Sequence, residues 1–116
     1  SVQLIVNSTD DIELKYTPSG SAVCNFSVAT NRYWTTEKNE KKEEAEFHRL
    51  VAWGKLAEIC NQWIKKGTKV YVKGRLSTRS FKDKMSVDRM VTEIVVEDMI
   101  VLENGKEMVQ KTEEVA

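Results

Sequence analysis

Residues 46–67, EFHRLVAWGKLAEICNQWIKKG, decide the fold, because a strand pattern gives way to a helix pattern within them. Over residues 46–53 the side chains should point alternately to the two faces of a strand. Beyond this strand, apolar residues recur three or four positions apart, which is typical of one helix face; they are Leu56, Ile59, Cys60, Trp63 and Ile64. A short helix therefore follows the strand, with Lys65 and Lys66 expected in its last turn and Gly67 as its stop.

The rest of the chain is predicted to form strands and polar connections. TPSG at residues 17–20 indicates a turn, and KDKMSVDR at residues 82–89 indicates a polar hairpin. Residues 35–45, TTEKNEKKEEA, show no apolar periodicity and are expected to form a long polar loop. Strands are predicted where β-prone or alternating residues occur, at residues 2–6, 22–29, 46–53, 68–81 and 91–102.

Five strands with one short α-helix between the third and the fourth is the order of an OB-fold, an all-β Greek-key barrel. The second and third strands of such barrels often bind oligonucleotides or oligosaccharides. We expect residues 1–102 to form this one domain, and residues 103–116 to be a short, flexible C-terminal extension. The fold by itself does not determine the ligand.

Length and composition narrow the class of protein. A chain of 116 residues suits one domain. Its 18 basic and 18 acidic side chains cancel, so the distribution of charge must indicate any polyanionic partner. Two cysteines are too few for a disulfide scaffold and favour a reducing, cytoplasmic location. No apolar run reaches the roughly 20 residues that span a bilayer, so no membrane association is expected.

The strongest chemical signal lies in residues 65–89, where nine lysines or arginines face two aspartates, a net charge of +7. Strand alternation places basic and aromatic side chains on one face; they are Tyr71, Lys73, Arg75, Arg79 and Phe81, with Ser77 between them. The opposite face, Val70, Val72, Gly74 and Leu76, is expected in the core. Cations for phosphates and flat rings for unpaired bases suit a single strand of nucleic acid. A solvated strand face is the plainer alternative.

The strand at residues 46–53 gives a second face of the same kind. If His48, Leu50 and Ala52 point inward, then Phe47, Arg49 and Trp53 point outward. Phe47 and Trp53 would lie about 20 Å apart along the strand, so each could stack a separate base. Trp53 in the core is the competing interpretation.

The other two tryptophans differ in their surroundings. Trp63 lies on the helix stripe, so we expect it in the core. Trp34 follows NRY at the edge of the polar loop, where a core position and an exposed platform are both consistent with the pattern.

Four segments together resemble the bacterial-type single-stranded DNA-binding proteins. They are ELKYTPSGSAVCNFSVATNRYW, EFHRLVAWGKLAEI, KKGTKVYVKGRLSTRSF and TEIVVEDMIVL, in the family's order and spacing. The resemblance covers nearly all of residues 2–102, and it implies non-catalytic binding of single-stranded DNA in replication, recombination and repair. It also implies a homotetramer, with His48 at a subunit contact.

By this resemblance the base-stacking aromatics are Trp34, Phe47, Trp53 and Phe81, and basic residues nearby hold the phosphates. Our choices for the phosphate contacts are Arg49, Lys55, Lys73, Arg75 and Arg79.

The sequence also departs from the family pattern. Val6 stands where the family usually has glycine, Ile12 where it often has proline, and Met90 where an aromatic is common. Family members usually carry a long C-terminal segment with an acidic tip that recruits replication and repair proteins, whereas this sequence ends in KTEEVA.

Other functions have weaker support. Catalysis would need Cys24 or Cys60 as nucleophile and His48 as base, but the cysteines fall on apolar strand and helix faces where packing is their ordinary role. One histidine and two separated cysteines supply no tetrahedral metal set, so neither metal nor cofactor is expected. An OB-fold accessory or RNA-binding module would use the same faces and remains the alternative.

Overall fold

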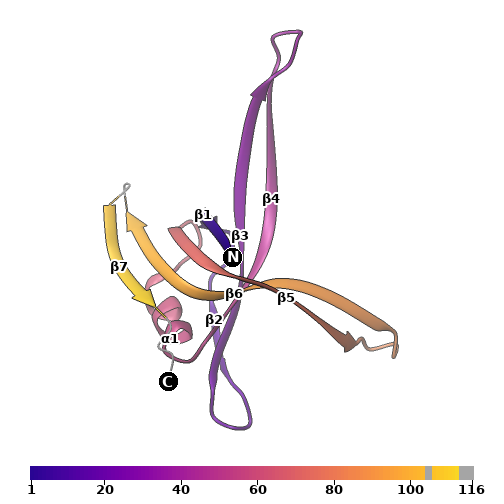
Figure 1. The fold of residues 1–116 in the computed structure, drawn as a ribbon, viewed down its shortest axis with the longest axis vertical. Coiled ribbons are helices and arrows are strands. Elements are labelled where there is room, and N and C mark those ends of the chain that lie inside the picture. Colours follow the sequence, from indigo (N-terminus) through magenta and orange to yellow (C-terminus); the bar gives the residue numbers. More distant parts are fainter. Residues whose placement is uncertain (104–105, 113–116) are drawn as a thin grey trace.

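The computed structural model describes residues 1–103 and 106–112, and it consists of seven strands and one helix (Figure 1). The single helix, α1 (Gly54–Trp63), lies between β4 and β5. The strands are β1 (Val2–Ser8), β2 (Glu13–Tyr16), β3 (Ala22–Thr35), β4 (Lys41–Trp53), β5 (Lys69–Lys82), β6 (Asp88–Glu103) and β7 (Lys106–Thr112).

Five of these strands close into a barrel. The sheet runs β1-β5-β6-β4-β3, and a further pairing of β1 with β3, Asn7 opposite Ala29 and Ser8 opposite Val28, closes the ring. All neighbours are antiparallel except β4 and β6, which pair in parallel at Leu50–Ile94 and Val51–Val95. The five strands predicted from sequence are these five, with the helix in the predicted place, so the expected OB-fold is confirmed.

Strict alternation along the strands fills the barrel. In β3 every second side chain from Ala22 to Val28 is buried, while those between are half-exposed. The buried residues that pack together in the barrel core are apolar. Val6, at the position where the resembling family usually has glycine, is buried in this core opposite Val70, so its side chain fills interior volume. Ile12 packs partly buried against the same core.

Two long hairpins extend from the barrel in different directions (Figure 1). The β3–β4 arm, residues 29–47, pairs from Ala29–Phe47 out to Thr35–Lys41. The expected polar loop at residues 35–45 is therefore wrong: a turn of only five residues, 36–40, joins two strands. The β5–β6 arm, residues 75–95, pairs out to Lys82–Asp88, which confirms the hairpin predicted there.

Leu76 corrects a second expectation, because its side chain is 63% exposed although the strand pattern placed it in the core. A bulge in the β5–β6 pairing occurs at Lys73/Gly74. Just beyond it β4 still pairs with β6 at Ile94 and Val95, and past these residues β5 and β6 form a free arm. Gly74 lies at this point because a Cβ there would come within 2.2 Å of the Val95 carbonyl oxygen. Alternation continues past Gly74, but Leu76 lies where the arm begins, and its side chain is exposed although Ile94 opposite it is buried.

The same turn closes three hairpins. In TPSGS (17–21), TEKNE (36–40) and DKMSV (83–87), the first residue's amide donates to the fifth carbonyl and the fourth amide donates to the first carbonyl. The fifth amide donates to the first side chain, an oxygen of Thr17, Thr36 or Asp83. The fourth residue has positive φ in each, as in a type I turn followed by a left-handed residue.

Helix α1 ends earlier than predicted. Its last residue is Trp63, so Lys65 and Lys66 follow the helix instead of lying in its last turn. Trp63 is 42% exposed, which corrects the expected core position. The buried residues of this segment are Leu56, Ala57, Cys60 and Ile64, a narrower stripe than the pattern indicated. No helix in the described part of the chain is both long and apolar enough to cross a bilayer.

The expected C-terminal extension, residues 103–116, lies partly outside the described residues. Within it, β7 pairs antiparallel with β6, from Glu103–Lys106 to Asp98–Thr112. This strand was not predicted from the sequence.

Candidate nucleic-acid interface

The outer face of β4 carries the aromatic and basic side chains predicted for it. Phe47 is 68% exposed, Trp53 is 44% exposed and Arg49 between them is exposed as well. On the inward face Leu50 and Ala52 are fully buried, so the predicted division of faces is confirmed. Val51 shares the outer face but is buried where β4 pairs with β6.

The β5 strand presents its basic face in two parts. Lys73 is half-buried in the barrel wall, while Arg75, Arg79 and Phe81 are exposed on the arm. Lys55 is exposed in the first turn of α1, two residues after Trp53. All the predicted phosphate-binding residues therefore have side chains that solvent reaches.

Arg79 differs from the other cations because it already has two partners. Its Nε donates to Oε1 of Glu93 at 3.0 Å, and its guanidinium lies 5.8 Å from the centroid of the Phe81 ring. Glu93 is buried, whereas the Arg79 side chain is exposed. Arg79 thus lies beside Phe81 on β5 and is paired with a carboxylate on β6 that was not identified from the sequence.

Trp34 is exposed but lies on the other face of the β3–β4 arm. It is opposite Lys42 and therefore shares a face with His48, whereas Phe47 is opposite Ala29. The Arg32 guanidinium lies 4.9 Å from the centroid of its ring. Of the two interpretations left open for Trp34, the core position is wrong, and one ring face is covered by a cation.

Tyr33 is an exposed aromatic that sequence analysis missed. It pairs with Glu43 on the β3–β4 ladder and shares a face with Phe47. Strand periodicity would have indicated its face. Tyr33 and Ala29 lie an even number of residues apart and so point to the same side, and Ala29 is opposite Phe47. The signal was hidden because the segment after it was expected to be a loop.

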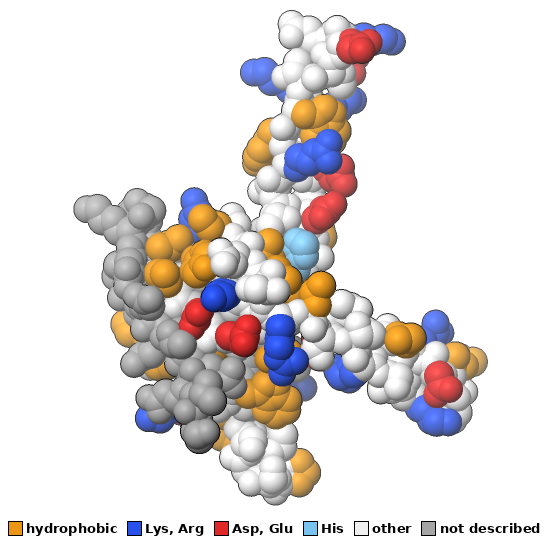
Figure 2. All heavy atoms as spheres, viewed as in Figure 1, with side chains coloured by type: hydrophobic (Ala, Val, Ile, Leu, Met, Phe, Trp, Pro, Cys, Tyr) orange, Lys and Arg blue, Asp and Glu red, His pale blue; other side chains and the backbone are white. Residues whose placement is uncertain are grey.

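The two arms differ in charge. Figure 2 shows hydrophobic side chains interspersed with basic and acidic ones along both arms. On the β3–β4 arm, EKNEKKEEAE at residues 37–46 holds five glutamates and three lysines. On the β5–β6 arm, GRLSTRSFKDKMSVDR at residues 74–89 holds five basic residues and two aspartates. Positive charge is therefore concentrated on the β5–β6 arm and not on the β3–β4 arm.

His48 lies at the base of the β3–β4 arm. It is half-buried, and its Nε2 is 3.1 Å from the Thr30 hydroxyl on β3. The only hydrogen-bonding partner of the His48 side chain in the described residues is this hydroxyl, a neutral group. It shares no hydrogen bond with either cysteine, as an activated nucleophile would require.

Both cysteines occupy the core, as their patterns predicted. Cys24 and Cys60 are buried and not disulfide-bonded. The hydrogen bond of Cys60 to Cys24 raises the pKa of the Cys60 thiol, and burial raises it further. The raised pKa disfavours the reactive thiolate. Among the described residues no group of three metal-ligating side chains occurs.

The protein is an OB-fold domain with exposed aromatic rings and cations on two arms. Such a surface suits an unpaired polynucleotide strand. Comparison with known proteins agrees: the model of the single-strand binding protein family matches residues 1–102. The chain belongs to this family.

Two relatives show the extent of the likeness. The chain is 46% identical over 102 residues to single-stranded DNA-binding protein 1 of Chlorobaculum tepidum, a match that covers 87% of this chain and 63% of that protein. The chain thus spans less than two-thirds of its relative's length. Its fold matches that of a Plasmodium falciparum SSB solved in complex with ssDNA, with a TM-score of 0.77 and 30% identity over 88% of this chain and 93% of that one.

Proposed function

We propose that the chain binds single-stranded DNA with little sequence preference, and that it protects exposed strands in replication, recombination and repair. The observation that carries this proposal is the outer face of β4, where Phe47, Arg49 and Trp53 are exposed while Leu50 and Ala52 on the other face are buried. Folding alone gives no reason to expose two large rings on one strand of a small barrel.

The division of labour follows from the chemistry of the ligand. Phe47, Trp53, Phe81 and Trp34 stack bases, each contributing about 1–3 kcal/mol with little preference among bases. Arg49, Lys55, Lys73, Arg75 and Arg79 contact phosphates. No bond is made or broken, so the protein is a binding protein and not an enzyme.

Parallel titrations with oligo-dT, oligo-U and a DNA duplex test this function, with quenching of tryptophan fluorescence as the signal. Tight binding to oligo-dT with weak binding to duplex supports it. Equal or tighter binding to oligo-U supports the alternative, an RNA-binding OB-fold module. Preference for duplex would contradict both.

Assembly as a homotetramer is part of the proposal, with His48 at a subunit contact. His48 suits this role because it is half-buried on one chain and lies at the base of an arm. Light scattering with and without oligo-dT tests it: a mass four times that of the chain is expected, and a monomer at micromolar concentration would contradict it. Recruitment of replication and repair proteins is proposed for the family's acidic tip and not for residues 1–102.

A further inference from the structure

Glu93 is a buried carboxylate on the surface proposed to bind a polyanion. Its side chain is only 7% exposed. The parallel pairing of β4 with β6 begins at Leu50–Ile94, so Glu93 is the β6 residue immediately before it, at the fork where the two arms separate (Figure 1). A negative charge placed there would repel phosphates unless it has another purpose.

The contacts of Glu93 fix one edge of an arginine. Arg79 Nε donates to Glu93 Oε1 at 3.0 Å, while the guanidinium lies near the Phe81 ring. A guanidinium carries five N–H donors in a rigid planar fork. Only Nε is engaged in the described structure, so the terminal nitrogens of Arg79 keep their donors for a ligand.

Arg79 is not free to leave this position at low cost. The second carboxylate oxygen, Glu93 Oε2, is also buried and has no hydrogen-bond partner among the described residues. Departure of Arg79 would leave a buried charge without its counter-ion, which is strongly unfavourable. A phosphate therefore cannot draw Arg79 away from Glu93, but it can bind the outward edge of the guanidinium while Glu93 holds the inner one.

We propose that Glu93 is a positioning residue for DNA binding: it orients Arg79 so that the terminal nitrogens bind a phosphate while a base stacks on Phe81, an inference that rests on the proposed function. The two β5 residues are two positions apart on the same strand face, and each is directly opposite a β6 residue, Val91 and Arg89. One nucleotide would be held at both ends. A carboxylate that repels phosphate at a distance thereby increases affinity through the arginine that it orients.

The sign of the effect of Glu93→Gln separates positioning from simple charge repulsion. If Glu93 only repelled DNA, removing its charge would tighten binding. If it positions Arg79, affinity for oligo-dT falls about three- to tenfold, and the log–log salt slope becomes about 0.7 less steep, as expected for one lost phosphate contact. Glu44→Gln on the exposed β3–β4 arm is the matched control, and it should bind as well as the unmodified protein or more tightly.

Arg79→Lys provides the second test, because lysine keeps the charge and can pair with Glu93 but lacks the fork. Its affinity for oligo-dT should fall by a similar factor. The double variant Glu93→Gln/Arg79→Lys should bind no more weakly than either single variant, because both changes disrupt the same phosphate contact. Thermal melting of each variant confirms that the folded protein is being measured. If Glu93→Gln does not fold, Arg79→Lys carries the test alone.

Two results overturn the inference: tighter binding by Glu93→Gln, or unmodified affinity and salt slope for Arg79→Lys. Neither result bears on the proposed function, which is tested with the unmodified protein. If that protein itself fails to bind oligo-dT, the proposed function fails first.

Discussion

Trp34 and Phe47 project from opposite faces of the β3–β4 arm, because Trp34 is opposite Lys42 and Phe47 is opposite Ala29. Phe47 instead shares its face with Trp53 on β4. A short oligonucleotide lying along one face can reach Phe47 and Trp53, whereas a strand that also reaches Trp34 must pass around the arm.

Dependence on oligonucleotide length should therefore distinguish these rings. With oligo-dT of about 8 nucleotides, within the range that one OB-fold covers, Phe47→Ala and Trp53→Ala should each weaken binding by about 1–3 kcal/mol. Trp34→Ala should weaken only the binding of longer strands. Tyr16→Ala, an exposed ring on β2, is the control. An equal loss for Trp34→Ala on the short strand would contradict this arrangement.

Arg75 should behave as a phosphate contact without a structural partner. It is exposed on the β5–β6 arm and makes no ion pair among the described residues. Arg75→Gln should make the slope of log affinity against log salt less steep by about 0.7, measured by titration with oligo-dT from low to high salt. Lys15→Gln on β2, where the lysine lies 4.0 Å from Glu13, should leave the slope unchanged. A slope that is identical for both variants would remove Arg75 from the site.

The barrel could be predicted from sequence because its strands have one buried face. Alternating burial in β3, and buried Leu50 beside exposed Arg49, reproduce the period-two pattern directly. The outer halves of the arms could not be predicted in this way. Residues 41–46 are exposed on both faces, so their strand is held by backbone hydrogen bonds and cross-strand pairs that leave no apolar pattern.

Three site features show other limits of pattern. Leu76 keeps strand alternation at the start of the arm, opposite the buried Ile94, so its exposure depends on where the barrel wall stops. Trp63 keeps the helical period but lies outside the narrower stripe that contacts the barrel. Glu93 has no sequence signal, since its burial arises from the fork between two arms.

Gly74→Ala should strongly destabilise the protein. An added Cβ would approach the Val95 carbonyl oxygen to 2.2 Å and the Ile94 side chain to 2.9 Å, so β5 and β6 must separate where they leave the barrel. Overpacking of this kind costs about 1–3 kcal/mol or more, which a urea unfolding curve measures. Ser77→Ala, farther along β5, is the control and should cost far less. Unchanged stability for Gly74→Ala would show that the strands can part at no cost.

Ser86→Gly should stabilise the turn of the β5–β6 arm. Ser86 has φ of 60°, a left-handed conformation that costs an ordinary residue about 1–2 kcal/mol. Glycine removes that cost but loses some chain entropy, so the expected net gain is about 0.5–1 kcal/mol, seen as a higher urea midpoint. The same change at Ser80, an exposed strand position, should destabilise instead. If glycine destabilises the protein at both serines, the left-handed conformation of Ser86 does not carry the cost that we assign to it.

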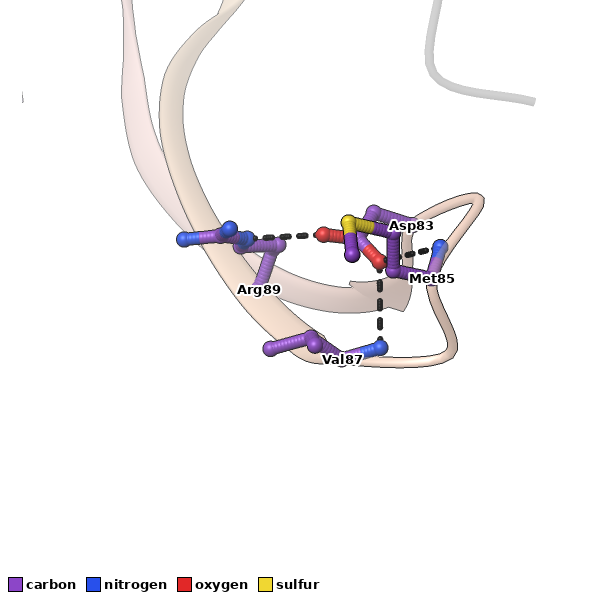
Figure 3. A network of polar contacts seen from close by, with 4 residues as sticks. All are labelled: Asp83, Met85, Val87 and Arg89. Atoms are coloured by element: carbon purple, nitrogen blue, oxygen red, sulfur yellow. Dashed lines mark hydrogen bonds and ion pairs between the residues drawn. The ribbon is translucent and has the colours of Figure 1, made fainter.

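The β5–β6 turn should loosen in acid because it depends on an ionised carboxylate. Asp83 Oδ2 accepts a hydrogen bond from Arg89 Nε at 3.0 Å, and Oδ1 accepts one from the Met85 amide at 2.8 Å and one from the Val87 amide at 3.0 Å (Figure 3). The Arg89 guanidinium, followed by the backbone amides, lowers the pKa of Asp83 below its ordinary value.

A lowered folded-state pKa means that these contacts stabilise the turn above the ordinary aspartate pKa, and that the stabilisation is lost as pH falls through the folded value. The carboxyl resonance of Asp83 should therefore titrate below an ordinary aspartate, and protection of the Val87 amide should decrease over the same range. The β3–β4 turn is an internal control, since the Glu40 amide donates to the neutral Thr36 hydroxyl at 3.2 Å. Asp83→Asn should abolish the pH dependence at Val87; equal acid sensitivity of Val87 and Glu40 would show that the carboxylate is not its cause.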